Sequence, residues 1–530
     1  MDRVYLKENV LVEPLFNQWY AWSYLISPHT AAMYIANLHL KIMQSYVASP
    51  QVHINAQKTP AMMGGPFINH DVDRVSYIKA LLERTIDQQQ HMLRFAESIQ
   101  ELDKMLVADG TGYSLEPLYQ KMPDALKGYV ELVYDLNNNP SMRFIEGLLY
   151  RSPYYDPSRQ SLMLSLIDGD NRSFVFSTPR LEDENHFHLR VPFSHKGLDE
   201  LFKMKSVPQS YEFIRQALGV GNEADEMFRS FFTEESPQPR AQPGNASVRV
   251  RYFGHACVLV ESEGCNVLCD PVISYKIDGG LSRYTYADLP EVIDYALITH
   301  NHQDHCMFET LLQLRHRIRN IIVPRSNGGG LADQSLKLAL RNTGFKNVTE
   351  IDEMEAMDVP GGMILGLPFL GEHGDLNIRT KTAYLIKLRE KSVVCAADSN
   401  NIDQTLYQHI HEATGDVDVL FLGMECNGAP LTWLYGPLLS TPLSRKMDQS
   451  RRFNGSNFER GIQIVDQLNP KQVYVYAMGQ EPWLTYLTSI RYTEESRPII
   501  ESNKLVEECA RRGLVAERLF GKKDIIIEQG

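Results

Sequence analysis

The sequence has few cysteines and no long apolar run, and these absences narrow the class of protein. Seven of the 530 residues are cysteine, and none belongs to a CxxC pair, which argues against a disulfide framework or a thiolate zinc finger. No basic segment followed by an apolar stretch comes after Met1, and no run of about 18 apolar residues occurs. We therefore expect a cytoplasmic protein without a membrane partner.

Long blocks of charge of one sign are absent as well. The 66 acidic and 53 basic residues give a formal net charge of −13, so there is no electrostatic reason to bind nucleic acid. The apolar content of 43% is enough for well-filled cores, and 530 residues exceed what one core usually supports. Two domains are therefore expected.

A proline-rich segment marks the expected domain boundary. Prolines recur among Ser, Gln, Gly and Asn between Thr233 and Ser247, a composition that resists both helix and strand. We place a linker at 236–247, between an N-terminal domain at 1–235 and a C-terminal domain at 248–530.

The N-terminal domain is predicted to be mixed α+β. Asp73 is the expected cap of one long helix that ends at Gly110, because apolar residues recur between them near the helical period. Those residues are Ile78, Leu82, Ile86, Leu93, Ile99, Leu102 and Leu106. Alternating runs at 162–167 and 186–191 are typical of strands.

The C-terminal domain is predicted to be an α/β sandwich. Helical stretches separate short β-rich segments, which is the pattern of sheets covered by helices. The segments are 248–253, 257–261, 266–269, 295–299, 392–397, 417–423 and 472–477. His300, Asp398 and Glu425 each follow one of these apolar runs, so we expect them to converge where strands leave the sheet.

The segment from His300 to His305 carries the strongest chemical signal. His300 and His302 are two residues apart and can face one ion, while Asp304 and His305 can face a second. A polar loop that caps a helix starting near Met307 is the alternative. Three histidines and an aspartate in six residues favour a dinuclear metal site.

This HxHxDH loop, with Gly254-His255 and Asp270-Pro271 upstream, resembles the metallo-β-lactamase superfamily over residues 247–520. The resemblance implies an αββα sandwich, in which His255 and Asp270 are more typical of structural supports than of ligands.

One departure from the hydrolases of that superfamily bears on the metal. Asp398 fits their bridging aspartate, but no histidine follows His411 to supply their last ligand. At the third-histidine position either Glu372 or His373 can bind. With Glu372 the donor set becomes rich in oxygen, which favours redox-active iron or manganese over zinc.

Three further motifs resemble a narrower family, the non-haem diiron β-hydroxylases typified by the chloramphenicol-pathway enzyme CmlA. They are GEHGD at 371–375, ADSN at 397–400 and MECNGAP at 424–430. With the chain length and the two-domain division, the likeness spans nearly the whole chain.

The resemblance implies a diiron monooxygenase of antibiotic biosynthesis. Its substrate would be an amino acid held as a thioester on the phosphopantetheine of a nonribosomal peptide synthetase carrier (thiolation) domain, hydroxylated at the β-carbon. The metal ligands would be His300, His302 and Glu372 for one iron, Asp304 and His305 for the other, and Asp398 as the bridge. The N-terminal domain would serve homodimerisation and carrier docking.

The same resemblance implies two co-reactants, dioxygen and an external electron donor. No GxGxxG motif opens a helix after a strand, so we expect a separate reductase or ferredoxin. The alternative function is a zinc-dependent hydrolase of a thioester, lactone or phosphoester, which needs no reductant. A carrier-docking scaffold with a degenerate metal site is a third possibility.

Two assignments stay open at this point. Glu372 and Asp398 are candidate catalytic residues, and Glu425 is a third, which hydrogen-bonds a ligand histidine, gates oxygen, or forms a structural ion pair. The best basic cluster on the acidic chain either meets the carrier or the phosphate of its arm, or is a solvated surface. It comprises Arg445, Lys446, Arg451 and Arg452.

Overall fold

The computed structural model describes residues 3–237 and 248–527. Most of the expected linker at 236–247 lies outside the described residues. In the described part of the chain, no helix has both the length and the apolar character needed to cross a membrane.

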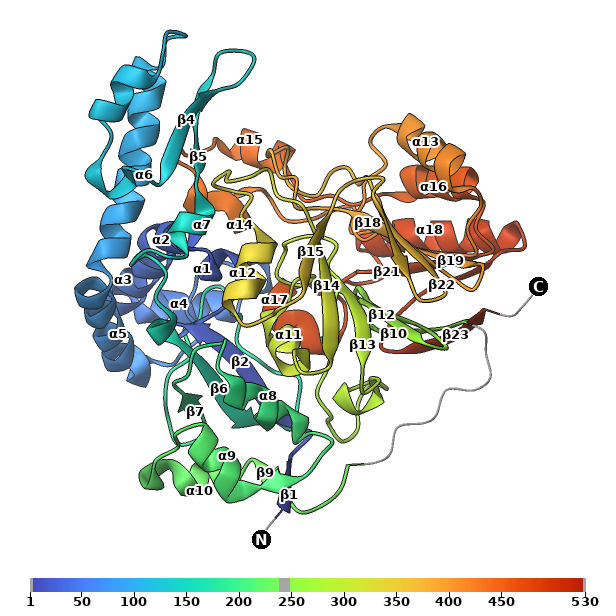
Figure 1. Ribbon diagram of the computed structural model, residues 1–530, viewed down its shortest axis with the longest axis horizontal. Coiled ribbons are helices and arrows are strands. Elements are labelled where there is room, and N and C mark those ends of the chain that lie inside the picture. Colours follow the sequence, from blue (N-terminus) through green and yellow to red (C-terminus); the bar gives the residue numbers. More distant parts are fainter. Residues whose placement is uncertain (1–2, 238–247, 528–530) are drawn as a thin grey trace.

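The N-terminal part combines small sheets with helices, as expected (Figure 1). Its strands are β1 (Arg3–Leu6), β2 (Val10–Phe16), β3 (Trp19–Tyr20), β4 (Val130–Tyr134), β5 (Pro140–Phe144), β6 (Gln160–Leu166), β7 (Phe187–Leu189), β8 (Gln209–Ser210) and β9 (Phe232–Thr233). They form the sheets β3-β2-β6-β7 and β8-β1-β9 and the hairpin β4-β5. The helices are α1 (Ser23–Ile26), α2 (Pro28–Tyr34), α3 (Leu40–Ala48), α4 (Pro50–Gln57), α5 (Val75–Gln88), α6 (Gln90–Asp109), α7 (Glu146–Leu149), α8 (Lys196–Lys203), α9 (Tyr211–Ala217) and α10 (Asp225–Arg229).

The C-terminal part contains two seven-stranded sheets. The first has the order β15-β14-β13-β12-β11-β10-β23 and the second β16-β17-β18-β19-β20-β21-β22. The strands of the first are β10 (Val248–Gly254), β11 (Cys257–Ser262), β12 (Cys265–Cys269), β13 (Ile293–Leu297), β14 (Ile318–Pro324), β15 (Val348–Ile351) and β23 (Lys523–Ile527). Those of the second are β16 (Ala356–Val359), β17 (Gly362–Leu367), β18 (Ala383–Leu388), β19 (Lys391–Cys395), β20 (Val419–Gly423), β21 (Gln472–Tyr476) and β22 (Val515–Arg518).

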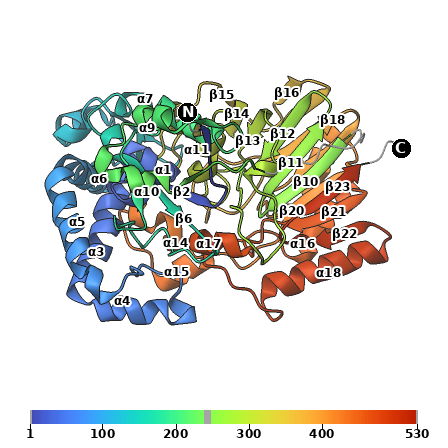
Figure 2. The same cartoon turned by 90° about the horizontal axis from the view of Figure 1, so that it is seen from below.

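Side chains alternate across the first sheet and so fill two separate cores. Val258 and Val260 point between the two sheets, while Cys257 and Leu259 join the core shared with the N-terminal part. The helices α13 (Gln404–Thr414), α16 (Phe458–Leu468) and α18 (Arg497–Arg511) cover the second sheet; α13 is labelled in Figure 1, and α16 and α18 also in Figure 2. The remaining helices are α11 (Phe308–Leu314), α12 (Leu336–Asn342), α14 (Thr432–Tyr435), α15 (Arg445–Ser450) and α17 (Thr485–Thr488). The expected αββα sandwich is confirmed.

The expected long helix is two helices, α5 and α6, broken at Gln89. Asp73 lies in a short 3-10 turn before α5 and does not cap it, although the end at Gly110 is as expected. Ile86, predicted on the buried face, is 41% exposed, because the buried face of α5 runs through Ile78, Leu81 and Thr85. Gln89 is no helix breaker, so the sequence pattern gave no sign of the break.

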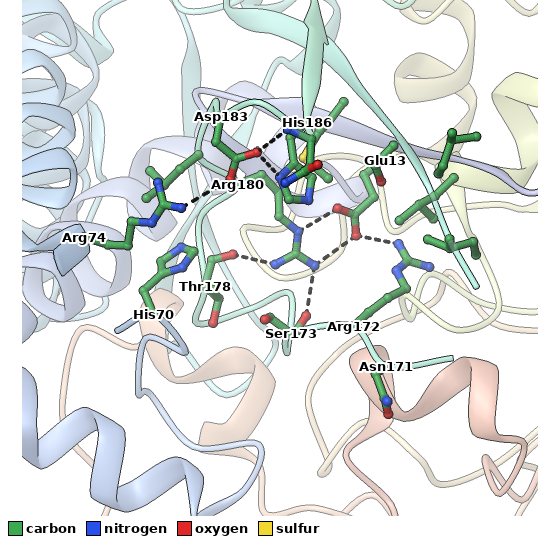
Figure 3. A pocket seen from close by; sticks show the side chains of 17 residues that line it. Glu13, His70, Arg74, Asn171, Arg172, Ser173, Thr178, Arg180, Asp183 and His186 are labelled. Carbon is green, nitrogen blue, oxygen red and sulfur yellow. Dashed lines mark hydrogen bonds and ion pairs between the residues drawn. The ribbon is translucent and has the colours of Figure 1, made fainter. Parts of the chain in front are cut away.

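A buried group of charges joins the N-terminal part to the sandwich, and its members Glu13, Arg172 and Arg180 are drawn in Figure 3. Glu13 on β2 accepts hydrogen bonds from Arg180 at 2.7 Å and Arg172 at 2.5 Å. Arg172 also donates to Glu309 on α11 at 2.7 Å, and Tyr20 donates to the same carboxylate at 2.9 Å. Glu13 and Glu309 are 1% and 3% exposed, so each carboxylate depends on these partners for its charge.

The first prediction concerns Glu13. Glu13→Gln leaves Arg172 and Arg180 buried without their shared anion, so we expect the free energy of unfolding to fall by about 3–5 kcal/mol. Chemical denaturation measures the change. Glu263→Gln is the control, because the pair between Glu263 and Arg389 is exposed and we expect a change below about 1 kcal/mol. Equal effects of the two substitutions would contradict the importance of the buried group.

The second prediction is the pH dependence of this contribution. Burial alone would raise the pKa of Glu13, but Arg180 and Arg172 lower it from 4.5 to about 2. A carboxylate with a depressed pKa stabilises the fold above its unfolded pKa and loses that contribution as the pH falls towards its folded pKa. The stability difference between wild type and Glu13→Gln should therefore be constant above about pH 5 and shrink between about pH 4.5 and 2. A difference that grows on acidification would rule this out.

Candidate metal centre

The side chains of the candidate centre lie where strands of both sheets end. His300 follows β13, Glu372 follows β17, Asp398 follows β19 and Glu425 follows β20. The structure brings the six predicted ligands together in groups of three whose ligand atoms lie within 4.8 Å of one another. The expected convergence of strand ends is therefore observed.

The first group consists of His300, His302 and Glu372. Nδ1 of His302 lies 3.1 Å from Oε1 of Glu372, and the Oη of Tyr435 lies 2.9 Å from Nε2 of the same ring. His373, the alternative to Glu372, belongs to none of the groups, and its ring lies against His302 with centroids 4.6 Å apart. The geometry thus favours Glu372 over His373 as the donor.

The second group consists of His300, His305 and Asp398. Oδ2 of Asp398 lies 3.0 Å from Nε2 of His305 and 3.6 Å from Nε2 of His300. A single carboxylate therefore faces one histidine from each half of the loop. That is the position required of a bridging ligand between two ions.

Asp270 determines which nitrogen of two histidines is available. Its Oδ2 accepts from Nδ1 of His305 at 2.7 Å and from the hydroxyl of Thr299 at 2.6 Å. Because the Thr299 hydroxyl spends its proton on Asp270, it acts as the acceptor for Nδ1 of His300 at 3.0 Å. Both rings are thus protonated at Nδ1, and the lone pairs at Nε2 point into the centre.

The third group consists of His255, Asp304 and His305, and its chemistry differs. Nδ1 of His255 accepts from the backbone N–H of Gly479 at 3.2 Å, so the proton of the neutral ring is on Nε2. Nε2 lies 3.2 Å from Oδ2 of Asp304 and has no hydrogen-bond partner among the described residues. The tautomer set by Gly479 thus turns an N–H of His255, and not a lone pair, towards Asp304.

The electrostatics of the centre fit bound cations. Among the described residues, Nε2 of His300, Nε2 of His305 and Oδ1 of Asp398 are buried without a hydrogen-bond partner. Burial, and then Asp398, raise the pKa of Glu372 well above its usual range. A metal ion would satisfy the unpaired donors and remove the repulsion between the carboxylates, so these residues fit a dinuclear centre.

The backbone is strained at this centre. His255, Asp270, Glu372 and Ala397 have φ values of 52°, 39°, 68° and 47°, in the left-handed region that non-glycine residues avoid. Such strain persists where the surrounding structure imposes it, and it gathers at functional sites. His255 and Asp270 come directly after β10 and β12, so the strained turn at each strand end positions a side chain that contacts a predicted ligand.

A cavity of about 240 Å³ leads away from the centre. His302, Asp304, Glu372 and Glu425 line one part of it. Burial, and then Asp398, raise the pKa of Glu425 to about 8, and the described chain contains no ion pair to this carboxylate. The expected alternative of a structural ion pair for Glu425 is therefore not observed.

Sequence reasoning missed several residues of the site. Met63 and Gly64 of the N-terminal part line the cavity, and Tyr435 contacts His302. No motif surrounds any of them, and they are distant in sequence from the HxHxDH loop. Asp270 was expected as a support, and its proximity to Pro271 after a strand was the available signal.

Comparison with known proteins identifies two family models in the chain. A model described as the diiron non-haem β-hydroxylase N-terminal domain matches residues 5–237. A second, the β-lactamase superfamily domain, matches residues 249–432. The first match ends at residue 237 and the second begins at residue 249.

Similar proteins extend the match to the whole chain. The 3-hydroxylase of 4-amino-L-phenylalanyl-CmlP-peptidyl-carrier-protein from Streptomyces venezuelae is 41% identical over 99% of both chains. The crystal structure of CmlA, a diiron β-hydroxylase from Streptomyces venezuelae, superposes with a TM-score of 0.93 at 40% identity, covering 99% of each chain. A mutant of CmlA gives a TM-score of 0.92 at 39% identity and covers 99% of this chain and 100% of its own.

The resemblance inferred from the sequence motifs is confirmed by these matches. The metal-bearing fold, the N-terminal model and the identity of 41% along almost the whole of both chains agree. This chain belongs to the family of non-haem diiron β-hydroxylases.

Proposed function

We propose that this chain is a diiron, dioxygen-dependent monooxygenase that hydroxylates the β-carbon of an amino acid held as a thioester on a nonribosomal peptide synthetase carrier domain. One observation carries the proposal. The relative that is 41% identical over 99% of both chains is named as a 3-hydroxylase of an aminoacyl group on a peptidyl carrier protein, and C3 of an amino acid is its β-carbon.

The alternative, a zinc-dependent hydrolase of a thioester, lactone or phosphoester, is not favoured. The full-length relatives are hydroxylases. The donor groups also include the carboxylates of Asp304, Glu372 and Asp398, and oxygen donors suit iron better than the histidine-rich sets of zinc hydrolases.

In the proposed centre, His300, His302 and Glu372 would hold one iron, Asp304 and His305 would hold the other, and Asp398 would be the ligand shared by both. When bound, the two irons supply the activation of dioxygen and the removal of a hydrogen atom from the β-carbon. The chain itself supplies orientation. Asp270 fixes the ring of His305 directly and that of His300 through Thr299, and Nε2 of His255 faces Asp304 at 3.2 Å.

The protein also shapes the space around the substrate. Phe453 packs on His302 with ring centroids 5.4 Å apart, and Met63 closes another wall of the cavity. These apolar walls limit access of water to the reacting atoms. Glu425 faces the same cavity.

Partners outside the chain complete the proposal. The electrons come from a separate reductase or ferredoxin. The enzyme is a cytoplasmic homodimer, and Glu372, Asp398 and Glu425 are its catalytic residues. The N-terminal part at 1–235 serves dimerisation and carrier docking. Its contribution of Met63 and Gly64 to the cavity supports a role close to the substrate.

The direct test is metal content and turnover. Protein made in iron-replete medium should contain about two irons per chain and show a visible absorption band that dithionite bleaches. With a reductant and dioxygen, an aminoacyl-loaded carrier should gain one oxygen atom by mass spectrometry. Two zinc ions, with release of the amino acid in the absence of a reductant, would instead establish the hydrolase.

A second test removes the oxygen donor that distinguishes this centre. Glu372→Ala should abolish hydroxylation and lower iron content while the circular dichroism spectrum stays that of the wild type. Asp375→Asn is the matched control, because Asp375 is exposed in the same loop. Unchanged turnover and iron content in Glu372→Ala would remove Glu372 from the centre.

A third test addresses Asp270. In wild type, Oδ2 of Asp270 accepts from both Thr299 and His305. Asp270→Asn replaces one carboxylate oxygen by an NH₂ group, which donates instead of accepting, and it removes the negative charge. We expect the iron dissociation constant to rise about 10–100-fold. Asp278→Asn, at an exposed aspartate away from the centre, is the control. Equal iron affinities would show that Asp270 does not set the tautomers.

A further inference from the structure

Two arginines line the same cavity as the metal ligands. The lining that includes His302, Asp304 and Glu372 also includes Arg452 and Arg491. The ligands are largely buried, whereas Arg491 is exposed. The cavity therefore extends from the metal centre to the protein surface, and the arginines mark its outer part.

Neither arginine is neutralised by the protein. In the described parts of the chain, Arg491 has no ion pair or hydrogen bond, and Arg452 contacts only Gln449, at 2.6 Å, through its side chain. Nε of Arg452 is buried and has no partner. On a chain with a net charge of −13, two unpaired guanidinium groups on one cavity wall are donors available to an anion.

The local structure holds the first of these arginines in place. Arg452 forms a β-bridge with Pro430, and the adjacent Phe453 packs against the ring of His302. The backbone of Arg452 is thus held next to a residue that contacts a predicted metal ligand. Arg491 lies between α17 and α18 and also lines the cavity.

The structure also divides the basic cluster expected from the sequence. Arg451 donates to the backbone oxygen of Gly374 at 2.7 Å, which gives it a structural role. Arg445 and Lys446 are exposed and do not line the cavity. Of the four residues, Arg452 alone lines the cavity that leads to the metal ligands. Arg491, which was not part of the expected cluster, also lines this cavity.

We propose that Arg452 and Arg491 bind the phosphate of the phosphopantetheine arm that carries the aminoacyl group. This inference rests on the proposed function, because it takes the substrate to be carrier-bound. The arm bears the thioester at one end and the phosphate at the other. With the thioester at the metal end, the phosphate lies towards the mouth, where planar guanidinium groups bind phosphate oxygens through paired hydrogen bonds.

The experiment compares two ligands that differ only in the phosphate, free phosphopantetheine and free pantetheine. Binding to the iron-loaded enzyme is measured by calorimetry at fixed ionic strength. We expect wild type to bind phosphopantetheine about tenfold more tightly than pantetheine, as a charge-assisted contact implies. Arg452→Gln and Arg491→Gln should each reduce this ratio towards one without changing the affinity for pantetheine.

The matched control is Arg497→Gln. Arg497 is an exposed arginine six positions from Arg491 and does not line the cavity, so its ratio should remain that of the wild type. Arg452→Lys should keep part of the ratio, since a lysine retains the charge but not the paired donors. A wild-type ratio near one, or an equal loss in Arg497→Gln, would overturn the phosphate site.

Turnover separates this inference from the proposed function. With an aminoacyl-loaded carrier, both variants should raise KM about tenfold or more and leave kcat unchanged, because the phosphate contact is made equally in the ground and transition states. If the phosphate ratio behaves as expected but no loaded carrier is hydroxylated, the proposed function fails while the phosphate site stands. If hydroxylation occurs and KM is unchanged, the phosphate site fails alone.

Discussion

The charge of Glu309 is the constraint on which the arrangement of the two halves depends. Glu309 is the second residue of α11, the helix that follows the HxHxDH loop, and it is 3% exposed. Arg172 and Tyr20, both from the N-terminal part, bind its carboxylate. Tyr275 and Tyr486 of the C-terminal part also donate to it, but Arg172 supplies the positive charge. A buried carboxylate without a cation costs several kcal/mol, so the N-terminal half stabilises the first helix of the metal-bearing half.

The HxHxDH loop, which directly precedes α11, is held by a second buried carboxylate. Thr299 and His305 both bond Asp270, which fixes the loop at each end between β13 and α11. The pair of Arg172 and Glu309 thus holds α11, and the Asp270 carboxylate orients the histidine rings of the loop. Because the loop and α11 are adjacent in the chain, the contacts that hold the two halves together also support the geometry of the metal centre.

The sequence predicted much of this because its signals are local. The seven β segments appear as strands within a few residues, and the six ligands follow strand ends, where spacing alone suggests convergence. The helix break at Gln89 carried no such signal, because it depends on packing and not on a breaker residue. The split of the basic cluster was equally hidden, since exposure at Arg445 and cavity lining at Arg452 depend on contacts with distant segments.

Gly64 has a consequence for how such enzymes diversify. Its carbonyl accepts from Nε1 of Trp433, and at φ 76° a side chain here would meet Ser489 within 2.9 Å. The segment around Gly64 therefore packs closely against the wall of the cavity, and no bulkier residue fits at position 64. Recombination that exchanges N-terminal halves between relatives would therefore also exchange part of the cavity wall next to the metal centre.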